Sequence, residues 1–121
     1  MAGYRLSGPA KADIVKLLAW TERQFGEAGR VRYAALITAV LHDISSQPDR
    51  VGSTLRPEPG EGVRSWHLRL SRERARTVTG IVRRPRHFLI YRMEGGLVVV
   101  GRALHDAMEL VHHLDAEKSW E

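Results

Sequence analysis

Apolar residues recur at helical spacing along the first third of the chain. One apolar stripe consists of Ile14, Leu17, Leu18 and Phe25. Ser7 followed by Pro9 is a helix-start signal, and Gly26 predicts the end of this helix. The stripe of a second helix, which ends before Pro48, consists of Tyr33, Ile37, Val40, Leu41 and Ile44. The pattern therefore predicts an α-helical hairpin, with a short strand before it at residues 3–6.

The rest of the chain favours strands. Residues 45–62 contain three prolines and three glycines and are predicted to form a loop. Apolar and polar residues alternate over 66–70, and residues 77–82 are rich in β-branched side chains, so each segment predicts a strand, with an exposed turn at 71–76. Two further apolar runs flank the glycine-containing segment 94–96. These runs predict a β-hairpin with a three-residue loop.

The order of these elements predicts the fold class. A capping-box pattern at 106–109 indicates a short C-terminal helix, and residues 115–121, including Trp120, are expected to form a flexible tail. We expect a single α+β domain over residues 1–121. In it, an N-terminal strand precedes an α-helical hairpin that packs on one face of a small antiparallel β-sheet, and the short C-terminal helix follows.

The composition narrows the class of protein. The 121 residues are 43% hydrophobic and 27% charged, as expected for one globular domain. They include no cysteine, which excludes disulfides and thiolate metal sites. The N-terminus has no signal-peptide pattern, and the longest apolar run, residues 33–41, is too short to span a membrane. We therefore expect a soluble, cytoplasmic protein with no membrane contact.

Positive charge is concentrated in the middle of the chain. The formal net charge is +5, and arginine supplies most of the cations. Because arginine pairs with both carboxylates and phosphates, an acidic protein and a nucleic acid are both possible partners. The candidates for contact with a target or a nucleic acid are Arg64, Arg72, Arg74, Arg76, Arg83, Arg84 and Arg86.

Several motifs, in a fixed order along the chain, carry a family resemblance. They are Tyr-Arg-Leu-Ser at 4–7 with Ala-Lys-Ala-Asp-Ile at 10–14, Trp-Thr-x-x-x-Phe-Gly at 20–26, Pro48 with Gly52, Gly-x-Arg at 62–64, His-x-x-x-Tyr-Arg at 87–92 and Arg-x-Leu-His-x-x-Met-Glu at 102–109. Over residues 4–114 this ordered set resembles the ParE-like toxins of the RelE/ParE superfamily. The segment 65–86 is longer than that family's pattern leads us to expect, so no family role is carried onto its arginines.

The resemblance implies a toxin of a type II toxin-antitoxin system. Such a toxin binds a cognate antitoxin protein, ParD-like or similar, in a stable higher-order complex. The free toxin stops growth, by poisoning DNA gyrase in the ParE branch or by cutting mRNA on the ribosome in the RelE branch. We expect the gyrase target, with the ribosome-dependent endoribonuclease as one alternative and a non-toxic nucleic-acid-binding module as another. No cofactor is expected.

RNA cleavage would need specific chemistry. Without a metal, it requires a base for the 2′-hydroxyl, cations for the phosphate and an acid for the leaving oxygen. If the chain is a nuclease, the candidates are Arg83, His87 and Tyr91. The predicted strands contain no lysine, whereas the RelE branch uses lysines and arginines on its sheet. Gyrase poisoning needs a binding surface rather than an acid and a base, and it is the hypothesis we prefer.

The predicted hairpin offers a surface for the antitoxin. A three-residue loop places Phe88 opposite Arg102, and the face directed toward the helices then carries Leu89, Tyr91, Met93, Leu97, Val99 and Ala103. The opposite face carries Phe88, Ile90, Arg92, Val98, Val100 and Arg102. An apolar face bordered by arginines is typical of a partner-binding groove. These six residues are therefore the predicted antitoxin-binding residues.

The remaining histidines and tryptophans are interpreted as structural. Glu109 and His113 are four residues apart on the predicted C-terminal helix, the spacing of a metal-binding pair. Polar residues of this kind also solvate short terminal helices, and no metal site is expected. His105 is expected to pack or hydrogen-bond at the corner between strand and helix. Trp20 and Trp66 are expected in the core or in helix packing.

Overall fold

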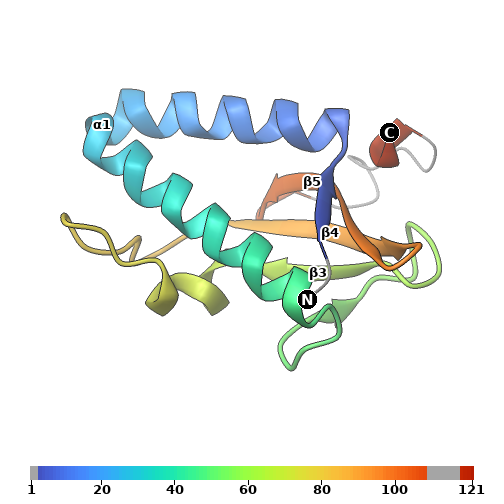
Figure 1. Cartoon of the computed structure of the whole chain (residues 1–121). Coiled ribbons are helices and arrows are strands. Elements are labelled where there is room, and N and C mark those ends of the chain that lie inside the picture. Colours follow the sequence, from blue (N-terminus) through green and yellow to red (C-terminus); the bar gives the residue numbers. More distant parts are fainter. Residues whose placement is uncertain (1–2, 109–117) are drawn as a thin grey trace.

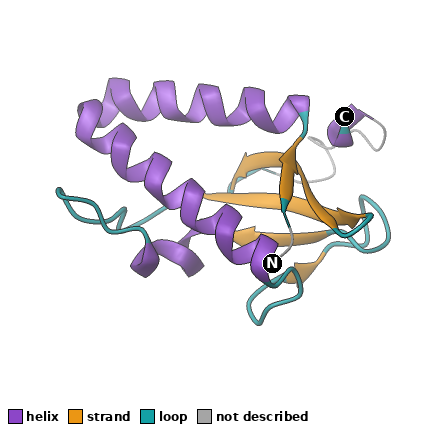
Figure 2. Cartoon of the chain, viewed as in Figure 1, coloured by secondary structure: helices purple, strands orange, loops and turns teal. Residues whose placement is uncertain are grey.

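The computed structural model describes residues 3–108 and 118–121 (Figure 1). Its elements are β1 (Tyr4–Leu6), α1 (Gly8–Ser46), β2 (Thr54–Leu55), β3 (Arg64–His67), the 3-10 helix η1 (Leu68–Arg74), β4 (His87–Glu94), β5 (Leu97–His105) and the 3-10 turn η2 (Lys118–Trp120). The strands form one sheet in the order β1-β5-β4-β3-β2, in which only β1 and β5 run parallel. The predicted α+β class is confirmed, and α1 lies over one side of the sheet (Figure 2).

Helix α1 is the predicted helical hairpin, bent at one glycine. The Ser7 side chain accepts a hydrogen bond from the backbone N–H of Ala10, as an N-cap does. Gly26 has φ 76° and ψ −177°, and the chain reverses direction there (Figure 1). A side chain rarely adopts this conformation, because its Cβ would clash with its own backbone. Gly26 therefore sets the angle between the two halves of α1.

This bend gives a prediction with a matched control. Gly26→Ala is expected to destabilise the protein by about 1–3 kcal/mol, from backbone strain alone, because a Cβ at Gly26 would meet no atom within 4 Å. A Cβ at Gly8 would also meet nothing within 4 Å, and Gly8 has no positive φ. Gly8→Ala is therefore expected to leave stability unchanged or slightly improved. Urea unfolding of the two variants measures both effects, and equal stabilities would contradict the assignment of strain to Gly26.

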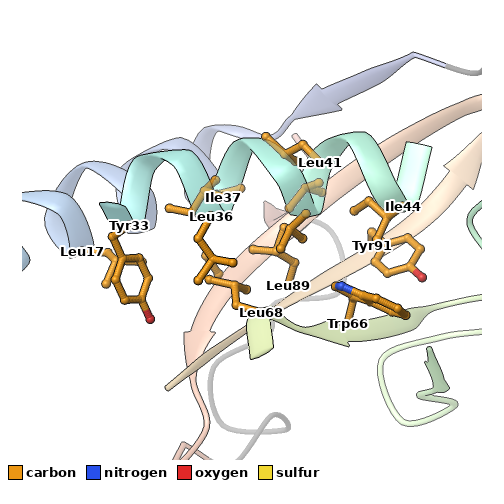
Figure 3. Close-up of a cluster of buried hydrophobic side chains, with 14 of the residues drawn as sticks. Leu17, Tyr33, Leu36, Ile37, Leu41, Ile44, Trp66, Leu68, Leu89 and Tyr91 are labelled. Carbon is orange, nitrogen blue, oxygen red and sulfur yellow. The ribbon is translucent and has the colours of Figure 1, made fainter. Parts of the chain in front are cut away.

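The core lies between the second half of α1 and the sheet (Figure 3). Its largest fully buried side chains include Leu36, Val40 and Ile44 from α1 and Leu89 and Tyr91 from β4. Trp66 of β3 is buried in the same cluster, as predicted. Tyr33 and Tyr91 lie at opposite ends of this cluster (Figure 3). Packing in the core therefore places the Tyr33 hydroxyl at one end of the sheet and the Tyr91 hydroxyl at the other.

The register of the β4–β5 hairpin differs from the prediction. Glu94 pairs with Leu97, so the loop is the two residues Gly95 and Gly96, both with positive φ as a two-residue hairpin turn requires. This shift of one residue reverses the faces of β5. The side chains of Val98 and Val100 belong to the core under α1, and Val99 lies on the opposite face. The prediction that placed Val98 and Val100 on the face away from the helices is therefore wrong.

A bulge then restores part of the expected pattern. Ile90 pairs with Arg102 and Tyr91 pairs with Val100, which leaves Gly101 as an extra residue in β5. Beyond the bulge Ala103 faces the core under α1, as predicted. The side chains of Leu89 and Tyr91 also face α1, as predicted.

The face of the sheet away from α1, here called the outer face, is not an open groove. Phe88 and Ile90 lie on it as predicted, but both are buried, in a cluster with Val63, Val99, Leu104 and Trp120. The indole ring of Trp120 is only 4% exposed and packs on Gly101, where a Cβ would come within 2.8 Å of the ring. The expectation that Trp120 lies in a frayed tail is therefore wrong.

The segment between β3 and β4 also differs from the prediction. Residues 68–74 form η1 rather than a strand and a turn, because Leu68 is buried in the core under α1 and the chain turns at that point. Residues 77–82 form no strand, since only the isolated bridge between Thr77 and Gly80 joins them. They belong to a loop, residues 75–86, that projects beyond the sheet (Figure 1) and is called the arginine loop below.

Two further predictions concern helices. Most of the predicted C-terminal helix, with Glu109, His112 and His113, lies outside the described residues, whereas Asp106 and Ala107 form a turn. Within residues 3–108 and 118–121, no helix combines the length and the apolar character needed to cross a membrane.

Candidate functional site

Three histidines, here called the histidine cluster, lie at one end of the sheet. His67 ends β3, His87 begins β4 and His105 ends β5. The antiparallel register pairs His87 with His105, and His67 with Phe88 beside them. The rings of His87 and His105 meet edge to face, with their centroids 5.2 Å apart. The sheet thus brings together three titratable rings that are far apart in the sequence.

Asp106 connects this cluster to Arg86. Its Oδ2 lies 3.0 Å from Nε2 of His67, and Arg86 donates to its Oδ1 from Nη2 at 3.0 Å and from Nε at 3.1 Å. These hydrogen bonds, above all those from Arg86, lower the pKa of Asp106 to about 2. Burial lowers the pKa of His67, although the hydrogen bond to Asp106 acts in the opposite direction. Asp106 is therefore a fixed anion that ties the start of β4 to the ends of β3 and β5.

Tyr33, from the second half of α1, contacts the other side of the cluster. Its hydroxyl lies 2.8 Å from Nδ1 of His87 and accepts a hydrogen bond from the backbone N–H of Arg86 at 3.3 Å. Burial raises the pKa of Tyr33 to about 12 and lowers the pKa of His87 to about 4, and the nearby His105 lowers the latter further. Both groups are therefore neutral at pH 7. Because the hydroxyl oxygen already accepts from Arg86, we assign the Tyr33 O–H as the donor to Nδ1, which leaves the proton of the neutral His87 ring on Nε2.

Because His87 is partly buried and neutral at pH 7, the stability of the protein should depend on pH. His87 takes up its proton near pH 6.5 when unfolded but only near pH 4 when folded. The unfolded state therefore binds more protons between these values, and the free energy of unfolding falls as the pH is lowered from about 6.5 to about 4. His87→Gln should flatten this dependence, whereas His42→Gln, at an exposed position of α1, should retain it. Urea unfolding across this pH interval checks both, and an unchanged slope in His87→Gln would contradict the assignment.

A cavity of about 480 Å³ opens beside the histidine cluster, between α1 and the arginine loop. It is lined by Trp20, Thr21, Phe25, Gly29, Arg32, Tyr33, Ile81, Val82, Arg83, Arg84, Arg86, His87 and His105. Trp20 and Phe25 precede the bend at Gly26, and their rings meet edge to face with centroids 6.1 Å apart. Both rings remain accessible, 47% and 63% exposed, although the sequence predicted both in packing positions. We call this hollow the Trp20 cavity.

The arginines predicted as target contacts have different environments. Four of them donate side-chain hydrogen bonds to other described residues; these are Arg64, Arg72, Arg74 and Arg86. The guanidinium groups of the other three are exposed and make no hydrogen bond or ion pair within the described parts of the chain; these belong to Arg76, Arg83 and Arg84. All three lie on the arginine loop. Among the seven arginines predicted as target contacts, those available for a partner therefore lie on this loop.

The three candidate nuclease residues are not all brought together. Arg83 and His87 line the Trp20 cavity. Tyr91 is four residues along β4 from His87, about 13 Å at the usual rise of a strand, and its hydroxyl donates to the backbone oxygen of Pro48 at 2.6 Å. The tyrosine close to His87 is Tyr33 instead.

The two arginines predicted to border the antitoxin surface point to different parts of the fold. The guanidinium of Arg92 lies 4.4 Å from the centre of the Trp120 ring and pairs with Glu94 at 2.8 Å. Arg102 turns toward α1, where its Nε donates to Oδ2 of Asp13 at 2.6 Å. Arg92 therefore stays at the outer face, whereas Arg102 stabilises the contact between β5 and the first half of α1.

Sequence reasoning missed most of this site. His105 was placed correctly at a strand end, and its Nδ1 accepts a hydrogen bond from the backbone N–H of Ala107. Tyr33 was assigned only to the core stripe and Asp106 only to a helix cap. A histidine at the end of each of three predicted strands is the signal that could have indicated the cluster. Using that signal requires the strand register, which the sequence did not supply.

Comparison with known proteins identifies one match. The family model described as the ParE toxin of the type II toxin-antitoxin system, parDE, matches residues 4–110. The match begins at β1 and extends past the end of β5, so it covers α1, the sheet and the histidine cluster. No individual curated protein matches the chain.

Proposed function

The chain belongs to the ParE toxin family of type II toxin-antitoxin systems, and on this premise we propose that it arrests growth by poisoning DNA gyrase in the cytoplasm. The observation that carries the proposal is the family match over residues 4–110. The family also implies an antitoxin partner that neutralises the toxin. Poisoning requires a surface that holds the enzyme in one state, and it requires no proton transfer by the toxin.

Two structural features support this target over the ribosome. The residues that sequence analysis selected for RNA cleavage are not together: Arg83 and His87 line the Trp20 cavity, whereas Tyr91 lies in the middle of β4 and donates to Pro48. The exposed arginines of the arginine loop instead form a cationic projection, suited to a complex that contains DNA or acidic protein surfaces. A projection of this kind adds contact area without needing a precise catalytic arrangement.

A direct assay tests the target. The purified toxin is added to a gyrase supercoiling reaction, and the trapped cleavage complex is measured as linear DNA after denaturation. We expect loss of supercoiling and accumulation of cleaved DNA, and both should be reversed by the cognate antitoxin. A translating extract serves as the parallel assay for mRNA cuts. Inactive toxin in the gyrase reaction with cuts in the extract would favour the endoribonuclease, and inactivity in both would favour a non-toxic nucleic-acid-binding module.

We also propose that the antitoxin contacts the outer face around Arg92. Val98 and Val100 lie under α1, and Arg102 is paired with Asp13. The proposed antitoxin contact therefore includes fewer residues than the six that the sequence predicted. The side chain of Arg92 is still partly accessible at the outer face. A carboxylate of the antitoxin could replace Glu94 as the partner of Arg92.

The contact is tested by measuring antitoxin affinity. Arg92→Glu is expected to weaken binding, because it places a like charge against the antitoxin carboxylate. Arg23→Glu is the matched control, since Arg23 is exposed on α1 and distant in sequence from this surface. Calorimetric titration of both variants against the cognate antitoxin gives the comparison. Equal affinities for Arg92→Glu and the unmodified toxin would reject this surface.

A further inference from the structure

The walls of the Trp20 cavity combine aromatic rings, histidines and arginines. Its volume of about 480 Å³ is within the range of pockets that hold small organic groups. A second hollow of about 300 Å³ shares Trp20, His87 and His105 with it. The Trp20 and Phe25 rings stand at the opening and keep much of their surface accessible. Accessible aromatic faces beside a hollow favour a flat ligand that can stack on them.

Two histidines in the wall of the cavity supply hydrogen-bond donors. Nδ1 of His87 accepts from Tyr33, so its proton is on Nε2. Nδ1 of His105 accepts from the backbone N–H of Ala107, so Nε2 of that ring carries a proton as well. Both rings line the cavity, and neither Nε2 atom has a hydrogen bond within the described residues. Two such donors favour a ligand that carries acceptors on its flat ring.

The rim of the cavity is cationic. Arg83 and Arg84 line it, and their guanidinium groups are exposed and without a partner among the described residues. No aspartate or glutamate lines this cavity in the described part of the chain. The rim therefore complements an anionic group next to the stacked ring.

We propose that the Trp20 cavity binds one unstacked nucleotide of a single-stranded nucleic acid. The base stacks on Trp20 and accepts hydrogen bonds from the two imidazoles, and its phosphates lie against Arg83 and Arg84. Aromatic stacking combined with cations along the backbone is the usual way in which proteins hold single strands. An apolar anchor of a peptide would use the aromatic walls but leave both imidazole donors unpaired. This site goes beyond gyrase poisoning and does not depend on it.

The tryptophans give a direct readout of binding. Trp66 and Trp120 are 3% and 4% exposed, whereas Trp20 is 47% exposed, so an uncharged quencher in solution acts mainly on Trp20. Titration with a short single-stranded oligonucleotide is expected to protect the fluorescence from acrylamide, with saturation. The matching blunt duplex is expected to protect much less, because its bases are stacked. Equal protection by the duplex, or no protection by the single strand, would overturn the proposal.

Variants of the cavity separate the contribution of stacking on Trp20 from that of the arginine charges. With a fluorescently labelled single strand, Trp20→Leu is expected to weaken binding about tenfold or more, and Trp20→Phe is expected to restore part of it. Arg83→Gln with Arg84→Gln is expected to reduce the slope of log affinity against log salt by about 1.4. Lys11→Gln with Arg23→Gln removes the same charge from exposed sites of α1 and should have a smaller effect. Thermal unfolding establishes that each variant is folded.

Two further ligands test whether the cavity binds a strand or a free nucleotide, and whether it binds a nucleic acid or a protein. A mononucleotide is expected to protect Trp20 only at much higher concentration than the oligonucleotide, and equal potency would assign the cavity to free nucleotides instead of a strand. Protection by an acidic amphipathic peptide without any protection by oligonucleotides would assign it to a protein partner. Either result would overturn the proposal without affecting the gyrase assay, which measures a different activity.

Discussion

Replacing Asp43 with alanine is expected to lower the free energy of unfolding by about 1–3 kcal/mol, because the buried hydroxyl of Ser71 would lose its acceptor and the half-exposed Arg74 its partner. Asp43 lies near the end of α1, with its side chain 7% exposed. Its carboxylate accepts hydrogen bonds from Ser71 Oγ at 2.6 Å and from Arg74 Nε at 2.9 Å, both in η1. Ser71 in turn accepts from Nε1 of Trp66. The substitution would therefore leave the buried Ser71 hydroxyl without its acceptor and would remove the carboxylate that pairs with Arg74.

The pH dependence of this network has a defined sign. Burial alone would raise the pKa of Asp43, but the hydrogen bonds from Arg74 and Ser71 outweigh it and hold the pKa below its usual value of 3.8. The stabilisation is therefore fully present above about pH 3.8 and is lost as the pH falls below that value. Urea unfolding of Asp43→Ala at neutral and acid pH should show a difference from the unmodified protein that shrinks on acidification.

A neighbouring carboxylate provides the control for Asp43. Asp49 is exposed in the loop after α1, so Asp49→Ala should change stability by less than about 0.5 kcal/mol. Asp43→Asn offers a second comparison, because it preserves the volume but removes the charge that pairs with Arg74. If Asp43→Ala were no more destabilising than Asp49→Ala, the hydrogen bonds around Asp43 would make no measurable contribution to stability.

Replacing Trp120 with alanine is expected to cost about 2–3 kcal/mol. Removal of a buried tryptophan usually costs about 3–5 kcal/mol, but Nε1 of Trp120 is buried without a hydrogen-bond partner among the described residues. An unpaired buried donor costs about 1–3 kcal/mol, so its loss offsets part of the effect. Trp120→Phe should therefore remain close to the unmodified protein, since it keeps an aromatic ring over Gly101 and removes the unpaired N–H.

The fit between Trp120 and Gly101 is tested by a double-mutant cycle. A Cβ at Gly101 would lie 2.8 Å from the indole ring, so Gly101→Ala should destabilise by about 1–3 kcal/mol. In a Trp120→Ala background the same change should cost much less, because the ring that it would meet is gone. Trp20→Ala, at an exposed site, is the control for loss of a tryptophan. Additive effects in urea unfolding followed by circular dichroism would show that the ring and the glycine do not interact.

The stability of this contact bears on the antitoxin proposal. Trp120 is stacked under Arg92, and the Arg5 side chain donates to the Trp120 backbone oxygen at 2.9 Å. An antitoxin that binds around Arg92 would therefore meet the C-terminal residues of the toxin as well. Both Trp120→Ala and Arg92→Glu should lower stability, because Arg92 stacks on Trp120 and pairs with Glu94, so the antitoxin affinities of the two variants are compared under conditions in which each is fully folded.

The sequence by itself determined the local elements of this protein and its family. The helical stripes, the Ser7 cap and the break at Gly26 each depend on residues close together in the chain, and all three are present. The ordered motifs from Tyr4 onward indicated the ParE family, which the match over residues 4–110 confirms. Patterns of this kind are reliable because periodicity and backbone preference are local properties.

Only the tertiary structure decided the register and the contacts between distant segments. A loop of two residues instead of three, followed by the bulge at Gly101, set which valines of β5 lie under α1. The packing of Trp120 on Gly101, the contact of Tyr33 with His87 and the contact of His67 with Asp106 also join residues far apart in sequence. The physical reason is that a strand has a side-chain period of two, so a slip of one residue reverses both faces while leaving the local pattern unchanged.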